Sequence, residues 1–357
     1  MSNPDPRSIG FTHTQPQQNF KLLELPPELV ELLSSDHPPT LYLKSPASTP
    51  ASQSGHGHSS KSSNGDFVNL CTPTQTYILR QVHSSNSIFL IKPSERPRDD
   101  HTINSDVNGR PDAGTSPHGK DPVVTAIALC KSTMELHEPD KSFSAFPFLL
   151  QSLRVYDGPL NSGDRMDIED GMDGTDTTQS RKVIKRVFAD VPLSPVECKA
   201  AWINICAFVH LDPTAGRLVA WQPFAAVKLE VWKKILEGSL LHEINLEKQF
   251  LARDLWKAIL DPDDDGTPFP RTLFDALIRR LTDNTSVSLY SEMNWASLDK
   301  NTTAKWIGEI YLETTAPDTG RAISHAQFLE AWRDLLPESW RAEASLDNME
   351  VRINHFY

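Results

Sequence analysis

The residues with the strongest suggestion of chemistry lie in the sequence DPDDDG. Four of them occupy positions 1, 3, 5 and 6 of a calcium-binding EF-hand loop, namely Asp261, Asp263, Asp265 and Gly266. Position 12 of such a loop needs a glutamate that binds calcium through both oxygens, but Thr272 stands there. Because the oxygen cage lacks that carboxylate, we interpret the segment as an acidic turn and expect no metal site.

Other residue types that could support catalysis or metal binding are poorly placed. His56 and His58 lie in a serine-rich segment without a third ligand, and the acid pair Glu169 and Asp170 lies in an acidic linker. The sequence contains no P-loop, no GxSxG and no HExxH pattern. We therefore expect a protein that is not an enzyme and has no cofactor. A hydrolase with a hidden site is an alternative that no triad or metal set supports.

The composition limits the classes of protein to which this chain can belong. The chain has 357 residues, enough for about two or three domains, and a net charge of −12. Such acidity excludes general nucleic-acid binding by bulk charge, so any DNA contact needs a local basic patch. The 4 cysteines form no CxxC pair, so we expect no zinc site, and so few thiols in a chain of this size fit a reducing compartment. Since no apolar signal core or membrane-length apolar run is present, we expect a soluble cytosolic or nuclear protein.

The N-terminal half shows the alternation of β-strands, interrupted by polar inserts. The stretch TYILRQVHSSNSIFLI, residues 76–91, reads as two strands folded back at His83–Asn86. Its second strand, 88–91, is apolar on both faces, so we expect it to be covered on both sides. Further strand-like stretches lie at 40–44, 123–139 and 146–159, and a short helix begins at Pro27. We expect a small antiparallel sheet or an open barrel.

The C-terminal half has the residue pattern of helices. A capping box, Ser194 with Glu197, starts one helix, and a helix at 223–237 is expected to stop at Gly238. The residues that follow repeat the order helix, helix, strand, strand, which is typical of a winged helix. A further helix opens at Ser324 with a second capping-box spacing.

Basic residues form only short clusters in this half. From residue 186 to 357 there are about 18 basic and about 25 acidic residues, so a DNA contact would be local. The residues expected to make it are Arg271, Arg279, Arg280, Lys233 and Lys234. The alternative is that they are solvated outer positions of helices. A separate stretch, RKVIKR at 181–186, is either a nuclear import signal or the strand that enters the next domain.

Four N-terminal stretches together resemble a known family. They are FKLLELPPELVELL, LYLKSP, VNLCTPTQTYILRQVHSSNSIFLI and ALCKSTMELHEP, in that order, and they are similar to the N-terminal domain of sister chromatid cohesion proteins of the Dcc type. GRLVAW and ISHAQFLEAWRDLLPE resemble the C-terminal half of the same family. The resemblance covers most of the chain except its polar inserts.

The resemblance implies a function in DNA replication and sister chromatid cohesion. Proteins of this family are non-ATPase subunits of the cohesion-specific alternative clamp loader, an RFC-like complex in the nucleus that loads PCNA. Their N-terminal sheet pairs with a small subunit and takes up the C-terminal tail of the large ATPase subunit. Their C-terminal winged helices are tied to the catalytic subunit of DNA polymerase epsilon and to DNA. The expected partner interface here comprises Tyr77, Leu79, Ile88, Phe89 and Ile91.

We therefore expect an α+β protein whose N-terminal antiparallel sheet or partial barrel is completed by a partner subunit and followed by α-rich tandem winged helices. The expected divisions are a disordered N-terminus (1–17), a β-rich heteromerisation domain (18–156) with disordered inserts at about 45–66 and 93–122, an acidic linker (157–185), winged-helix units at 186–240 and 241–313, and a partial or short third unit (314–357). The alternative function is that of a winged-helix transcription or chromatin adaptor.

Overall fold

The computed structural model describes residues 10–45, 67–97, 120–140, 142–158, 175–260, 269–282, 288–317, 323–346 and 349. The chain divides into two compact units. One takes Met1–Leu41, Lys61–Leu70 and Tyr77–Pro139, and the other takes Tyr42–Ser60, Cys71–Thr76 and Asp140–Tyr357. The second unit therefore includes two short pieces from the N-terminal part of the sequence.

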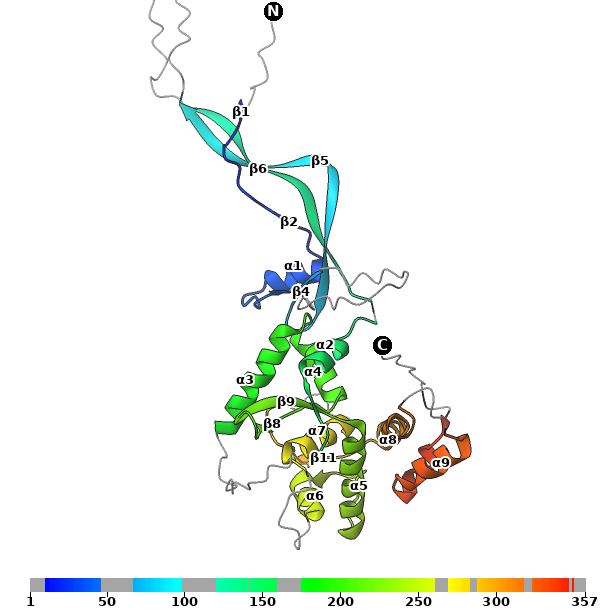
Figure 1. Cartoon of the computed structure of the whole chain (residues 1–357). Coiled ribbons are helices and arrows are strands. Elements are labelled where there is room, and N and C mark those ends of the chain that lie inside the picture. Colours follow the sequence, from blue (N-terminus) through cyan, green and yellow to red (C-terminus); the bar gives the residue numbers. More distant parts are fainter. Residues whose placement is uncertain are drawn as a thin grey trace, which may run out of the picture. The chain divides into compact units, whose positions relative to one another are not determined.

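A six-stranded sheet is the main feature of the N-terminal part (Figure 1). Its strand order is β1 (Gly10–His13), β6 (Lys120–His137), β5 (Thr76–Pro97), β4 (Val68–Cys71) and β3 (Tyr42–Lys44), while β2 (Leu22–Leu23) also pairs with β6. β5 runs antiparallel to β6, but β1 and β2 run parallel to it, so the sheet is mixed rather than antiparallel. β1 lies inside the expected disordered N-terminus.

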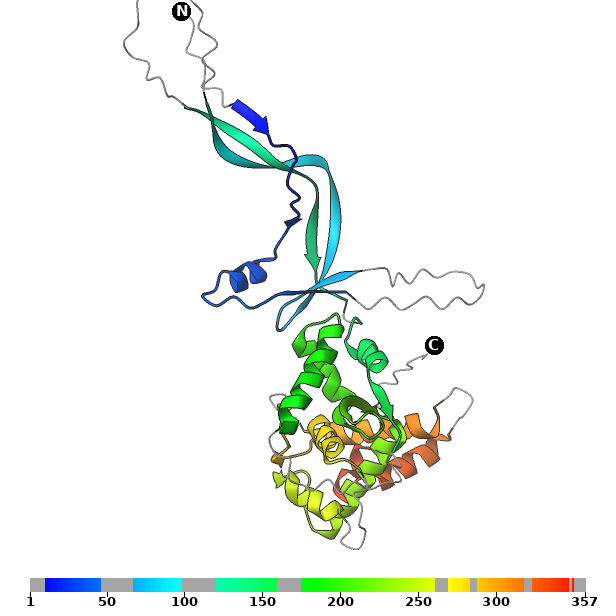
Figure 2. The same ribbon diagram turned by 60° about the vertical axis from the view of Figure 1, so that its left-hand side comes forward.

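β5 corrects the predicted hairpin. Residues 76–91 do not fold back at His83–Asn86; they belong to a single strand of 22 residues that pairs with β6 from Ile78 to Pro97. The register shifts between His83 and Ile88 instead. A tight hairpin turn needs residues with positive φ, and this segment has neither a glycine nor a residue in that region. A β-bulge absorbs the polar residues, and the two long strands wind around each other (Figure 2).

A small core lies beside the sheet in the first unit. Helix α1 (Pro27–Leu33) begins with proline at its first turn, as predicted. Its Leu29 is buried against Leu70 and Tyr77. The remaining length of β5 and β6 has no helix packed on it among the described residues.

The second unit opens with six elements in the order helix, strand, helix, helix, strand, strand. They are α2 (Phe146–Ser152), β7 (Arg154–Tyr156), α3 (Thr175–Asp190), α4 (Pro195–Asn204), β8 (Phe208–Asp212) and β9 (Arg217–Pro223). The three strands form a sheet in the order β7, β9, β8. The capping box predicted at Ser194 and Glu197 is confirmed at the start of α4.

Two boundaries of this group differ from the expectation. α2 and β7 fall within the range assigned to the N-terminal domain, yet β7 pairs with β9 in the second unit. α3 begins inside the expected acidic linker, and the stretch RKVIKR is part of this helix rather than a strand. The reason is the helical spacing of Ile184 and Phe188, which are both buried in one core.

A second group of elements has a similar order of helices and strands. It contains α5 (Ala225–Leu241), β10 (Phe250–Leu251), α6 (Ala252–Ile259), α7 (Arg271–Leu281) and β11 (Trp295–Ala296), with β10 antiparallel to β11. Gly238 does not stop α5, which continues to Leu241. A Cβ at Gly238 would lie only 3.1 Å from the carbonyl oxygen of Ala258, so the glycine permits close approach of α5 and α6.

The chain continues with α8 (Lys300–Thr315), α9 (His325–Asp334) and the 3-10 helix η1 (Glu338–Glu343). The predicted cap of α9 is confirmed, since the Ser324 side chain accepts a hydrogen bond from the backbone N–H of Gln327 at 3.3 Å. None of the described helices is long and apolar enough to cross a membrane. Within the same residues, no three His, Cys, Asp or Glu side chains gather as metal ligands. The sequence DPDDDG, His56, His58, Glu169 and Asp170 lie outside the described residues.

Candidate partner-binding surfaces

The predicted partner interface divides into buried and exposed residues. Tyr77 is buried in the small core with Leu29 and Leu70, so it supports the sheet from inside. Leu79 is half-buried and pairs with Leu136 on β6. Neither residue is presented freely on the surface of the first unit.

The other three predicted residues are exposed on the distal part of β5. Ile88, Phe89 and Ile91 expose 37%, 48% and 57% of their surface. The prediction that this strand is covered on both sides is therefore wrong for the chain by itself. A β-strand that is apolar on both faces needs cover on both faces, and the described residues of this chain do not supply it.

Phe11 on β1 joins this surface, although the sequence analysis missed it. Its ring meets the ring of Phe89 edge to face, with the centroids 6.5 Å apart, and it is itself 63% exposed. The only signal in the sequence is one phenylalanine in a polar segment, which is too weak to predict a strand. We call Phe11, Ile88, Phe89 and Ile91 together the apolar β-surface; it includes both faces of β5, because Ile88 and Phe89 are consecutive strand residues.

A hollow of about 620 Å³ lies at the bulge of the same sheet. Phe20, Gln81, His83 and Cys130 are among the residues that line it. The side-chain amide of Gln81 donates to Ser132 Oγ at 2.9 Å across the two strands. The hollow therefore lies where the register of β5 and β6 shifts, and a side-chain hydrogen bond joins the two strands there.

The arginines predicted to contact DNA on α7 point largely into the protein. Arg279 is only 7% exposed and donates to the carbonyl oxygen of Ser291 at 3.0 Å. Arg271 pairs with Asp275 at 3.1 Å and lies over the rings of Trp256 and Phe274. These side chains hold α7 in place and offer little charge to a ligand.

Asp275 on the same helix is buried as well, whereas Arg280 is half-buried. Arg280 has a buried Nε without a hydrogen-bond partner among the described residues. Burial raises the pKa of Asp275 to about 6, although Arg271 and Arg279 act in the opposite direction. Burial of the carboxylate therefore outweighs the attraction of its two arginine neighbours.

Lys233 and Lys234 are exposed on α5, but each has an acidic neighbour. Lys233 lies 2.7 Å from Glu230, and Lys234 lies 3.0 Å from Glu237. Both pairs are solvent-exposed, so they add little stability but reduce the local positive potential. The structure does not unite the five predicted cations on one basic surface, because Arg279 is buried, Arg271 is paired with Asp275 and the two α5 lysines are paired with glutamates.

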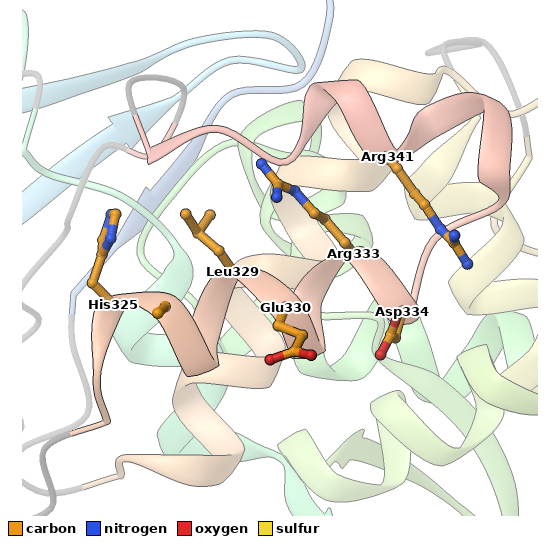
Figure 3. A pocket seen from close by; sticks show the side chains of 7 residues that line it. His325, Leu329, Glu330, Arg333, Asp334 and Arg341 are labelled. Carbon is orange, nitrogen blue, oxygen red and sulfur yellow. The ribbon is translucent and has the colours of Figure 1, made fainter.

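A second hollow, of about 520 Å³, lies on α9 and η1 (Figure 3). Figure 3 shows Leu329, Glu330, Arg333 and Asp334 projecting from α9, with Arg341 projecting from η1. Two arginines and two carboxylates nearly balance, and the residues make no ion pair with one another at salt-bridge distance. Such a mixed, open surface suits a shallow protein contact better than a small ligand.

Comparison with known proteins identifies the family. No curated protein matches the chain. The model of the family described as sister chromatid cohesion protein Dcc1 matches residues 20–352, which is nearly the whole chain and both of its units. The resemblance inferred from the four N-terminal stretches is thereby confirmed. The chain belongs to the Dcc1 family of sister chromatid cohesion proteins.

Proposed function

We propose that this protein is a non-catalytic subunit of an alternative RFC-type clamp loader that acts in the nucleus. Membership of the Dcc1 family supports a role in sister chromatid cohesion. In the proposed assembly, partner subunits hydrolyse ATP and load PCNA, and this chain holds parts of the machine together. Its contact with PCNA is therefore indirect.

The observation that carries the proposal is the apolar β-surface beside an open strand edge. β5 has 22 residues and β4 has 4, so most of the second edge of β5 has no strand partner among the described residues. An exposed apolar sheet with an open edge promotes aggregation in a free protein and serves as a template when a partner adds strands. Phe11, Ile88, Phe89 and Ile91 would provide the apolar contacts of that docking.

We propose two occupants for this surface, the small cohesion-type clamp-loader subunit and the C-terminal tail of the large ATPase subunit. Strand addition would satisfy the backbone groups of β5, and the partner's apolar side chains would cover Ile88 and Ile91. Tyr77 and Leu79 would act from beneath by keeping the sheet in shape. This assignment refines the expected interface, because the two residues contribute packing rather than contact.

The second unit is proposed to carry the winged helices that reach DNA polymerase epsilon and DNA. The order helix, strand, helix, helix, strand, strand from α2 to β9 supports this interpretation. The order helix, strand, helix, helix, strand from α5 to β11, with β10 paired to β11, supports it as well. α8, α9 and η1 supply helices for a partial third unit. The hollow on α9 and η1 has the mixed charge of a polar protein interface and is the proposed side of polymerase contact.

The test compares two phenylalanines with similar exposure. Phe89→Asp should abolish co-purification of the small subunit, because an unpaired carboxylate in a dry interface weakens binding by at least about a hundredfold. Phe224 is 55% exposed and is the N-cap of α5 in the second unit, where aspartate is a favourable cap. Phe224→Asp should therefore leave assembly intact. Normal assembly of the Phe89→Asp variant in size-exclusion chromatography would refute the proposed interface.

A further inference from the structure

A group of exposed basic residues without acidic partners in the described part of the chain lies on α3. Lys182, Lys185 and Arg186 are all exposed, and they follow the spacing of three and four residues that places side chains on one side of a helix. None of the three makes an ion pair with a described residue. The only acidic residue from 177 to 190 is Asp190 at the end of the helix. We call these three residues the α3 cationic face.

The core holds this face in a fixed orientation. Ile184 and Phe188 are buried on the opposite side of α3, where the ring of Phe188 meets Trp202 with centroids 5.7 Å apart. Arg181 is held over the ring of Tyr290, 4.8 Å from its centroid. The helix packs against β8 and β9 of the same unit (Figure 1), while the side chains of Lys182, Lys185 and Arg186 are exposed.

We propose that the α3 cationic face binds the phosphate backbone of nucleic acid without sequence preference. Three cations about 5–6 Å apart on one helix match a row of phosphates, and phosphate contacts position a protein without reading bases. No large apolar side chain is exposed on α3 among its described side chains. A protein partner would need such an anchor at the centre of its interface, so the face suits nucleic acid better than an acidic protein.

The helical structure of RKVIKR also bears on its interpretation as a nuclear import signal. A basic stretch of this kind can serve nuclear import or nucleic-acid binding. Recognition as an extended peptide would pull Ile184 and Phe188 out of the core, whereas phosphate contact uses the folded helix. The inference rests on the proposed DNA contact of this subunit, and it moves that contact from α5 and α7 to α3.

The experiment measures binding of the full chain to a labelled mixed-sequence DNA duplex by fluorescence anisotropy over a range of salt. Lys182→Gln, Lys185→Gln and Arg186→Gln are combined in one variant. The matched control combines Lys233→Gln, Lys234→Gln and Arg253→Gln, which removes the same charge from exposed cations that already lie near carboxylates. Circular dichroism and the unfolding midpoint verify that both variants remain folded.

We expect the α3 variant to bind at least about tenfold more weakly at low salt, with the slope of log K against log salt reduced by about 3. The control variant should keep most of the affinity and the slope. Equal binding by the wild type and the α3 variant would overturn the inference and leave DNA contact elsewhere in the protein. Absence of salt-dependent binding by the wild type would overturn both the inference and the DNA part of the proposed function, while assembly through Phe89 would stand.

A competition experiment with polyglutamate distinguishes binding of nucleic acid from binding of an acidic protein. If the α3 cationic face binds phosphates, duplex DNA should displace the labelled DNA at a much lower concentration of charge than polyglutamate does. Displacement at equal charge, lost in the α3 variant, would show that the face recognises acidic polypeptides and would overturn the inference.

Discussion

Gly308 on α8 lies directly beneath the indole of Trp332 on α9. A Cβ at Gly308 would come within 2.6 Å of Cε2 of that ring, closer than any real contact allows. The indole Nε1 also donates to the carbonyl oxygen of Ala304 at 2.8 Å, so the ring is fixed on α8 by one hydrogen bond and by the missing side chain. The packing of α9 on α8 therefore depends on a glycine in the middle of a helix.

Gly308→Ala should destabilise the second unit by about 1–3 kcal/mol, despite the higher helix propensity of alanine. The added methyl group must push Trp332 away from Ala304 or separate the two helices. Urea unfolding measures the change. Trp332→Phe should cost less in the Gly308→Ala background than in the wild type, because the smaller ring makes room. Additive effects in this double-mutant cycle would contradict the proposed clash.

Because of Asp275, the free energy of unfolding should fall as the pH rises from about 4 to 7, whereas most carboxylates in folded proteins have the opposite effect. Its folded pKa is raised from 3.8 to about 6 by burial, so the native state holds a proton that the unfolded chain has lost. Its stabilising contribution is complete below about pH 4 and is lost as the pH rises through 6. The measurement compares unfolding free energies of the wild type and Asp275→Asn between pH 4 and 7.

The asparagine variant resembles the protonated carboxyl and lacks this titration. Its stability relative to the wild type should therefore rise with pH over that window, by an amount on the order of 2 kcal/mol. A constant difference across the window would show that the carboxylate of Asp275 is as well stabilised in the folded protein as in water. Arg271, which contacts Asp275, stays unchanged in this comparison.

Three buried thiols should resist alkylation in the native protein. Burial raises the pKa of Cys198 to about 12 and also raises the pKa values of Cys71 and Cys206. The thiolate is the reactive form, so at pH 8 all three should remain unmodified by iodoacetamide for as long as the second unit stays folded. Mass spectrometry should find them modified in guanidinium chloride. Rapid native modification of Cys206 would show that its core opens readily.

Lys44 should contribute to the stability of the second unit through the end of α3. Its ammonium donates to the carbonyl oxygens of Phe188, Val191 and Leu193 at 2.8, 3.1 and 2.8 Å. Lys44→Met should cost about 2–3 kcal/mol, because three carbonyl groups lose a charged donor at the end of a helix. Lys248→Met, at an exposed lysine, is the control and should change stability by less than about 0.5 kcal/mol. Equal effects of the two substitutions would deny Lys44 this role.

Features that depend on neighbours within one helical turn could be predicted from the order of the amino acids alone. The caps at Ser194 and Ser324 and the proline start of α1 were predictable, because a cap joins a side chain to a backbone N–H three residues away. The family resemblance could also be recognised from the sequence, since it rests on stretches of consecutive residues. The end of α4 was harder to predict from the sequence, because Cys206 adopts the left-handed conformation (φ 56°) that glycine usually adopts after a helix.

Which residues are paired, buried or exposed depends on contacts that form only in the folded protein. β5 continues past His83 because β6 offers strand pairing on both sides of the register shift, from Ile78 to His83 and again from Ile88 to Pro97. The Lys44 side chain contacts the rest of the second unit because carbonyl groups more than 140 residues away accept its hydrogen bonds. Arg279 of α7 is buried, while Lys182, Lys185 and Arg186 of RKVIKR are exposed on α3. A local pattern shows that a helix is amphipathic, but the direction of each charge depends on contacts between residues far apart in the chain, which no local spacing records.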